Sequence, residues 1–235
     1  MNIRVKFSKT GSMKFIGHLD IMRYFQKAIR RAGIDIAFSG GFSPHMIMSF
    51  AAPLGVGITS SGEYFDMEVN STYSSEESLR RLNEVMVEGI EVLSYRKVPE
   101  SKASKAMSLV AAADYLVTFR PGKEPAQDWK TKLAEFYSQD SITVWKKTKK
   151  SEKEMDIRPF IYQLFLQGDA VFMQLAAGST SNTKPELVME AFAAYAGIAM
   201  DEFAYTVHRL EVYANTGTEE KPVWIPLEGL GEEIE

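Results

Sequence analysis

The opening stretch NIRVKFSKTGSMKFIGHLDIMRYFQKAIRRAGIDIAFS (residues 2–39) decides the fold. Apolar and polar residues alternate through NIRVKFS (2–8), which predicts a half-buried strand. From His18 the apolar residues recur every three or four positions up to Gly33, which predicts an amphipathic helix that ends at the glycine. The segment IDIAFS (34–39) then predicts a second strand, so the chain opens as strand, helix, strand.

The next segments complete a repeating unit. SGEYFDMEV (61–69) predicts a third strand, and SSEESLRRLNEVMVEG predicts a helix that begins at Ser75 and ends at Gly89. IEVLSYRKV (90–98) predicts a fourth strand, and the order βαββαβ is that of a ferredoxin-like domain. A small, polar segment, 99–108, separates this unit from the rest of the chain.

The same plan returns after the polar segment. Strands are predicted over 114–120, 141–147, 170–178 and 203–214, helices over 124–139 and 184–197, an inserted hairpin arm over 156–169 and an acidic tail over 215–235. We therefore expect an α+β protein with two tandem ferredoxin-like (βαββαβ) domains. The expected domains are 1–98, which contains a glycine-rich loop, and 99–235, which contains the arm and the tail.

The composition excludes several classes of function. Hydrophobic residues make up 45% and charged residues 25%, as in an ordinary globular protein. No run approaches 18 apolar residues and the amino terminus alternates like a strand, so we expect a cytoplasmic protein with no membrane partner. The chain has no cysteine, which excludes disulfides, thiolate zinc sites, a cysteine nucleophile and a cysteine-bound iron–sulfur cluster. We predict no cofactor.

The charge is divided along the chain. Residues 1–60 contain eight Lys and Arg against two Asp, a net charge of +6, whereas residues 61–95 contain eight acids against two Arg, a net charge of −6. A basic surface beside an acidic one favours a polyanionic partner more than the overall charge of −4 indicates. The alternative is that these charges are only solvated.

Two loops are expected to meet. The loops that follow the first and second strands of a βαββαβ unit lie at the same end of the sheet, which places GSMKFIGHLD (11–20) beside SGGFSPHMIMSFAAPLGVG (39–57). The second loop is longer than a turn requires, and loops of that length are commonly functional. His18 and His45 are then on adjacent loops.

His18 and Asp20 have two further interpretations. Either side chain at the start of a helix satisfies free backbone N–H groups as a cap. Together with His45 they also make a set of two imidazoles and one carboxylate, but the spacing contains no known metal-binding pattern, so we predict no metal site.

A binding surface is the hypothesis that joins these features. Basic side chains recur on one side of the first helix, and with Lys9 and Lys14 they are suited to hold phosphates, while Phe15, Tyr24 and Phe42 are available to stack on unpaired bases. An Arg-Pro pair at Arg158 adds a stiffly held guanidinium in the second domain. The expected ligand-binding residues are Gly17, His18, Asp20, Arg23, Lys27, Gly40, Gly41, Phe42, Ser43, Pro44, His45 and Arg158, with Arg30 and Arg31 extending the stripe.

The run from Lys14 to Val69 resembles the signature of the radical SAM-linked protein family, a bacterial domain of unknown function that is also found fused behind cobalamin-binding radical SAM proteins. DIRPFI (156–161) and VHRLEVY (207–213) resemble its later signatures. The resemblance implies a radical SAM protein as partner. Because the chain lacks cysteine, it would be an accessory and not the radical SAM catalyst.

At the level of fold, tandem βαββαβ domains are also similar to the CRISPR repeat-processing endoribonucleases. That resemblance implies a general base, His18 or His45, and a cation such as Arg23. The glycine-rich loop near the carboxyl terminus of those enzymes is absent here. Three hypotheses therefore stand: an RNA-binding or substrate-presenting accessory module, a metal-independent endoribonuclease, and a domain that only docks onto another protein.

Overall fold

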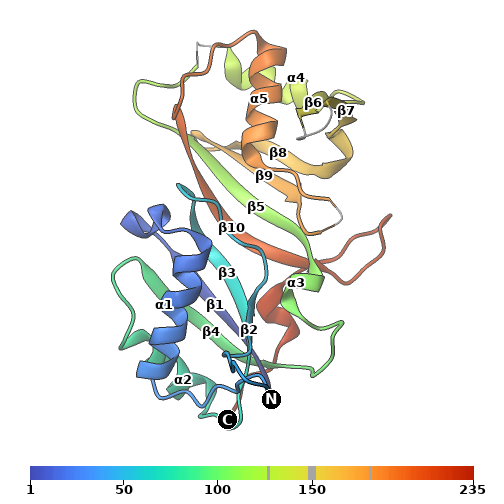
Figure 1. Cartoon of the computed structure of the whole chain (residues 1–235). Helices are drawn as coiled ribbons and strands as arrows, with labels where there is room; N and C mark the ends of the chain where they lie inside the picture. Colours follow the sequence, from blue (N-terminus) through green and yellow to red (C-terminus); the bar gives the residue numbers. More distant parts are fainter. Residues whose placement is uncertain (126–127, 148–151, 180) are drawn as a thin grey trace. The chain divides into compact units, whose positions relative to one another are not determined.

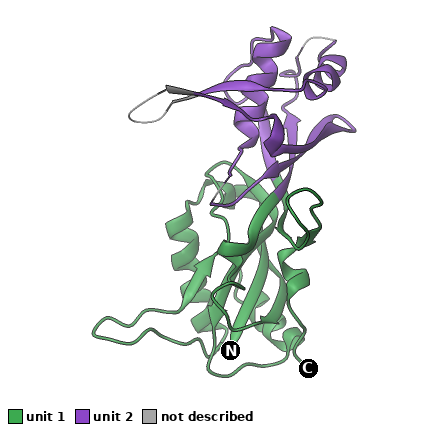
Figure 2. Ribbon diagram, turned by 90° about the vertical axis from the view of Figure 1, so that its right-hand side faces the viewer, with its two compact units in different colours: residues 1–112, 209–235 green, residues 113–208 purple. Residues whose placement is uncertain are grey.

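The computed structural model describes residues 1–125, 128–147, 152–179 and 181–235. The chain forms two compact units, residues 1–112 with 209–235 (unit 1) and residues 113–208 (unit 2), coloured separately in Figure 2. The fold is α+β, with a large, mostly antiparallel sheet (Figure 1). The strands β5 (Val110–Phe119) and β10 (Tyr205–Asn215) each begin in one unit and end in the other.

Unit 1 is built around β1 (Asn2–Lys9). This strand pairs antiparallel with β4 (Ile90–Val98) on one side and with β3 (Thr59–Glu68) on the other. The short strand β2 (Met48–Phe50) pairs antiparallel with β3, so the order is β4-β1-β3-β2. The other elements are η1 (Gly11–Phe15), α1 (His18–Arg31), α2 (Ser75–Asn83), α3 (Ala106–Leu109), β11 (Trp224–Pro226) and η3 (Leu227–Leu230).

The first, third and fourth strands and both helices expected before residue 98 are confirmed, but the second helix begins at Ser75 and ends at Asn83, before the expected Gly89. Ser74, and not Ser75, caps α2, because its hydroxyl accepts a hydrogen bond from the Glu77 N–H at 3.2 Å. The expected strand over 34–39 is wrong. That segment makes only isolated bridges, Ile36 to Val69 and Phe38 to Met46, and β2 takes the place beside β3.

One face of the unit 1 sheet is apolar and lies against α1 and α2. Side chains of β1 and β3 pack there against Phe25 of α1 and Leu82 of α2. Four phenylalanine rings meet at the centre, those of Phe7, Phe25, Phe50 and Phe65. The ring centroids are 4.7 Å apart for Phe7 and Phe25 and 4.9 Å apart for Phe25 and Phe65. Aromatic pairs of this kind contribute about 0.5–1.5 kcal/mol each beyond burial, so this cluster anchors α1 to the sheet.

The opposite face of the same sheet carries buried charges. Arg4 donates to both carboxylate oxygens of Asp66 at 2.8 and 3.0 Å and to the carbonyl of Leu227 at 3.1 Å. The Lys6 ammonium donates to Glu211 at 2.7 Å and to Glu228 at 2.6 Å. Arg4 also donates to the Ser104 carbonyl, just before α3, at 2.7 Å. Because Leu227 and Glu228 lie in η3, the carboxyl-terminal tail covers this face and belongs to unit 1.

Unit 2 has the strand order β10-β5-β9-β8. Its elements are α4 (Trp129–Tyr137), β6 (Thr143–Lys147), β7 (Glu152–Asp156), η2 (Arg158–Phe160), β8 (Ile161–Gln167), β9 (Ala170–Ala176) and α5 (Pro185–Ala196). The structure corrects two expectations here: 141–147 lies in a separate two-stranded sheet formed by β6 and β7, and the expected arm contains β8, a strand of the main sheet. Positions 126–127 of the helix expected over 124–139 lie outside the described residues.

Candidate functional site

The outward face of α1 is a row of exposed cations. Ile21, Phe25 and Ile29 bury the opposite side of the helix. The helical period therefore turns the polar side to solvent. This exposed stripe consists of Arg23, Lys27, Arg30 and Arg31.

The stripe is weakly neutralised. Arg23 contacts Asp20 at 3.2 Å, but both side chains are about two-thirds exposed, so water screens the pair. Within the described residues, Lys27, Arg30 and Arg31 form no ion pair with a carboxylate. These three charges are available to an anionic ligand.

Apolar side chains are exposed around the start of α1, in η1, in the first turn of the helix and in the 51–58 loop. Phe15 at the end of η1 is 65% exposed, and Leu19 and Val56 are 60% and 64% exposed. The Lys14 ammonium lies 5.2 Å from the centre of the Phe15 ring. The helix begins at the N-cap Gly17 without a side-chain cap, so the expectation that His18 or Asp20 caps the helix is wrong.

A cluster of buried charges lies beneath this end of α1. Lys9 donates to the Ile16 carbonyl at 2.7 Å, and Arg209 donates to the Ala52 carbonyl at 2.6 Å. Arg209 also forms a bidentate ion pair with Glu63, in which the Arg209 Nε lies 2.7 Å from the Glu63 Oε1. Burial, together with the charge of Arg209, lowers the pKa of Lys9 below its usual value, although Glu63 opposes the shift. The cluster fixes two surface segments, residues 10–17 and 51–58, from below.

His18 turns toward this interior. Its ring meets Phe50 edge to face, with centroids 5.1 Å apart, and it lines a small cavity together with Lys9 and Glu63. The imidazole is therefore packed against the core cluster and is not part of the exposed stripe.

The 40–45 loop lies elsewhere, and the expectation that His18 and His45 are on adjacent loops is wrong. Because β2 spans 48–50, the loop after the second strand is 51–58, and the Gly57 N–H donates to the Lys14 carbonyl at 2.8 Å. The hairpin around 40–45 starts beside Glu68, which pairs with Asn2, whereas Lys9 pairs with Ser60. Seven residues of strand, about 23 Å, separate these two ends.

The 40–45 hairpin has its own structure. The Ser39 hydroxyl lies 2.8 Å from Nδ1 of His45 and accepts the His45 N–H at 3.1 Å. Gly41 has a φ of +96°, a conformation that favours glycine, and Phe42 at the tip is fully exposed. Gly40, Ser43 and Pro44 are exposed as well.

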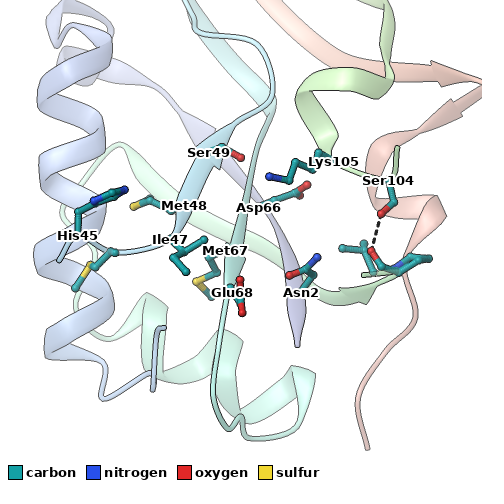
Figure 3. A pocket seen from close by; sticks show the side chains of 13 residues that line it. Asn2, His45, Ile47, Met48, Ser49, Asp66, Met67, Glu68, Ser104 and Lys105 are labelled. Atoms are coloured by element: carbon teal, nitrogen blue, oxygen red, sulfur yellow. Dashed lines mark hydrogen bonds between the residues drawn. The ribbon is translucent and has the colours of Figure 1, made fainter. Parts of the chain in front are cut away.

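His45 also borders a pocket of about 210 Å³ (Figure 3). Asn2, Ser49 and Lys105 bring polar groups to it and Met48 is apolar. Asp66, which is ion-paired with Arg4, also lines it. This pocket is separate from the α1 stripe.

Arg158 lies in unit 2 and is engaged there. Its guanidinium donates to the carbonyls of Gln139 at 3.1 Å and Ile161 at 3.2 Å, and it stacks 4.2 Å from the centre of the Tyr137 ring. These contacts hold the segment between β7 and β8, which is a structural use of this side chain.

Lys9, Glu63 and Arg209 were not predicted as one cluster. The sequence contained a signal for two of these residues. Lys9 follows the buried, apolar positions of β1, and Glu63 stands among those of β3, so each places a charge where the alternating pattern otherwise has an apolar residue. A charge at a core position indicates a buried partner.

No group of three or more His, Asp or Glu suited to a metal ion occurs among the described residues. No helix in these residues is long and apolar enough to cross a membrane.

The fold and site thus define an α+β protein with a basic helix face and a buried charge cluster. A family model described as an uncharacterized protein conserved in bacteria (DUF2344) matches residues 2–185, and the chain belongs to this family. The sequence matches none of the curated proteins. Among solved structures it is similar to a chain of a Cbf5-Nop10-Gar1 complex, with 11% identity and a TM-score of 0.45 over 89% of this chain and 48% of that one. This chain therefore spans about half the length of that chain.

Proposed function

We propose that this protein is a non-catalytic accessory module that binds or presents RNA through the outward face of α1, within a radical SAM system. The observation that carries the proposal is the stripe of four exposed cations, three of them without an ion-pair partner among the described residues. Each phosphate held by such a cation releases a counterion, which makes binding favourable at low salt.

Four of the eight acids in residues 61–95 are paired with arginines outside this stripe. Glu63 and Asp66 are buried in ion pairs with arginines, and Glu77 and Glu84 pair with arginines of α2. Among the described residues, Lys27, Arg30 and Arg31 have no ion-pair partner, although the whole chain has a net charge of −4.

The radical SAM part of the proposal rests on the resemblance of Lys14 to Val69 to that family. A chain without cysteine has no thiolate for the cluster that this chemistry needs, so the catalyst would be the partner. We further infer that both units are variants of the ferredoxin-like plan. The orders β4-β1-β3-β2 and β10-β5-β9-β8 support this, with β6 and β7 as an insertion.

The test is fluorescence anisotropy of labelled transfer and ribosomal RNA fragments across a salt series. The Arg23→Glu and Lys27→Glu double variant should lose most of the affinity. A matched double variant, Lys102→Glu and Lys221→Glu, makes the same change in net charge at exposed lysines outside α1 and should bind like the wild type. If the α1 variant binds as tightly as the wild type, this surface is not the RNA site.

A denaturing gel of the same samples separates the other hypotheses. RNA that is bound and stays intact supports a non-catalytic module. Cleavage that disappears in His18→Ala or His45→Ala would instead support an endoribonuclease. No RNA affinity at low salt, with a stable complex formed by a purified radical SAM protein, would support the docking domain.

A further inference from the structure

We infer that the RNA bound by α1 is single-stranded and that an unpaired base stacks on Phe15 at the start of the helix. This inference rests on the proposed function and names the class of RNA that the same surface accepts.

The structure selects Phe15 from the three aromatic residues that were candidates for stacking. The Tyr24 hydroxyl donates to the Met86 sulfur at 3.4 Å and accepts the Val87 N–H at 2.8 Å, so this side chain is already in use. Phe42 lies in the 40–45 hairpin, beside the opposite end of β1. Phe15 is 65% exposed and immediately precedes the helix that carries the stripe.

The surroundings of Phe15 suit a nucleotide. The Lys14 ammonium lies over one face of the Phe15 ring, 5.2 Å from its centre, so a cation for the phosphate is held next to the aromatic side chain on which the base would stack from the other face. Leu19 and Val56 are also exposed, and Val56 lies close to Gly17, since a Cβ added at this glycine would be 4.0 Å from its side chain. In a duplex the base faces are covered by stacking, and only an unpaired base can use this platform.

The spacing of the cations in the stripe fits a single RNA strand that lies along the axis of α1. With a rise of 1.5 Å per residue, Arg23 and Lys27 are separated by roughly 6 Å along the axis, and Lys27 and Arg30 by roughly 4.5 Å. The 14 residues of α1 span only about 21 Å, so the helix holds a few nucleotides. Three engaged phosphates on a single strand would give a slope of about −2 in log K against log salt.

The platform is held rigidly before any ligand arrives. Buried Lys9 holds the Ile16 carbonyl, and buried Arg209 holds the Ala52 carbonyl. The Gly57 N–H joins the two segments at the Lys14 carbonyl. Little ordering of the backbone is then required on binding, which favours a stacking site.

The experiment compares three labelled ligands by anisotropy: a 12-nucleotide uridine strand, the same strand paired with its complement, and an abasic strand of equal length. We expect the wild type to bind the uridine strand more tightly than the duplex. Phe15→Ala should weaken binding of the uridine strand about tenfold, as the loss of one stacked base predicts, and should leave the abasic strand unchanged. Phe15→Leu, which keeps apolar area without the ring, should behave similarly.

The controls separate stacking from charge and from folding. Phe203→Ala removes a phenylalanine in unit 2 that is 74% exposed and should bind like the wild type. Lys27→Gln should reduce the salt slope by about 0.7 while Phe15→Ala leaves it unchanged. Equal or tighter binding of the duplex, or an unchanged Phe15→Ala affinity, would overturn the single-strand inference and leave the RNA proposal standing. If none of these RNAs binds at low salt, the proposed function itself fails.

Discussion

The Glu63 carboxylate on β3 and the Arg209 guanidinium on β10 form a two-pronged ion pair in the interior of unit 1. The two side chains are only 5% and 6% exposed, and they lie 146 residues apart in the sequence. Arg209 also holds the Ala52 carbonyl, so this pair links the sheet to the loop beside α1.

Glu63→Gln should destabilise the protein strongly. The amide keeps the shape of the side chain but leaves two cations, Arg209 and Lys9, buried without a carboxylate. Breaking a buried pair in this way costs about 3–5 kcal/mol. Urea unfolding measures the effect, and Glu88→Gln, at an exposed position, should remain within about 0.5 kcal/mol of the wild type. A loss below 1 kcal/mol for Glu63→Gln would mean that the pair is not formed.

Lys9 should make stability depend on pH. Because its pKa in the folded protein is lower than the usual 10.5, the unfolded chain binds more protons between the two values. The contribution of Lys9 to the free energy of unfolding is therefore fully present above pH 10.5, and it is lost as the pH falls through the lowered pKa. Relative to Lys9→Met, the wild type should gain at most about 1.4 kcal/mol per pH unit in that window. Parallel unfolding curves from pH 7 to 10.5 check this, and a constant difference would contradict it.

Gly62 should not tolerate a side chain. A Cβ at this position would lie 2.7 Å from the Leu210 carbonyl oxygen and 2.8 Å from the Glu211 Cα, where backbone atoms cannot move aside cheaply. Gly62→Ala should cost about 1–3 kcal/mol, as overpacking does. Gly40→Ala is the matched control, because nothing lies within 4 Å of a Cβ there. Thermal unfolding of both variants decides, and equal melting temperatures would refute the close approach of β3 and β10.

His18→Ala should affect stability more than RNA binding. The variant loses the edge-to-face contact with Phe50, which is worth about 0.5–1.5 kcal/mol. Because the ring faces the core and not the stripe, the affinity for single-stranded RNA should stay within about twofold of the wild type. Unfolding and anisotropy on the same preparation provide the comparison. A large loss of affinity without a loss of stability would make His18 a ligand contact.

Local patterns determined much of unit 1. Alternation predicted β1, β3 and β4, the three-to-four period predicted α1, and the same period placed Arg23 and Lys27 on its solvent side. These features depend on residues close in sequence, and a period of 2 or 3.6 reports them directly. The strands of unit 2 were harder to predict from local patterns, since an apolar run such as IYQLFLQ (161–167) has the same appearance in a hairpin arm and in a strand of the main sheet.

The tertiary structure alone decided which segments lie together. The pattern of IDIAFS (34–39) predicts a strand, but MSF (48–50) takes the place beside β3, which puts the 51–58 loop, and not the 40–45 hairpin, beside the start of α1. The sequence by itself determined that α1 carries a basic face. Only folding determined that Lys9, Glu63 and Arg209 share one buried cluster beneath it, because burial and pairing of charges depend on contacts between residues far apart in the chain.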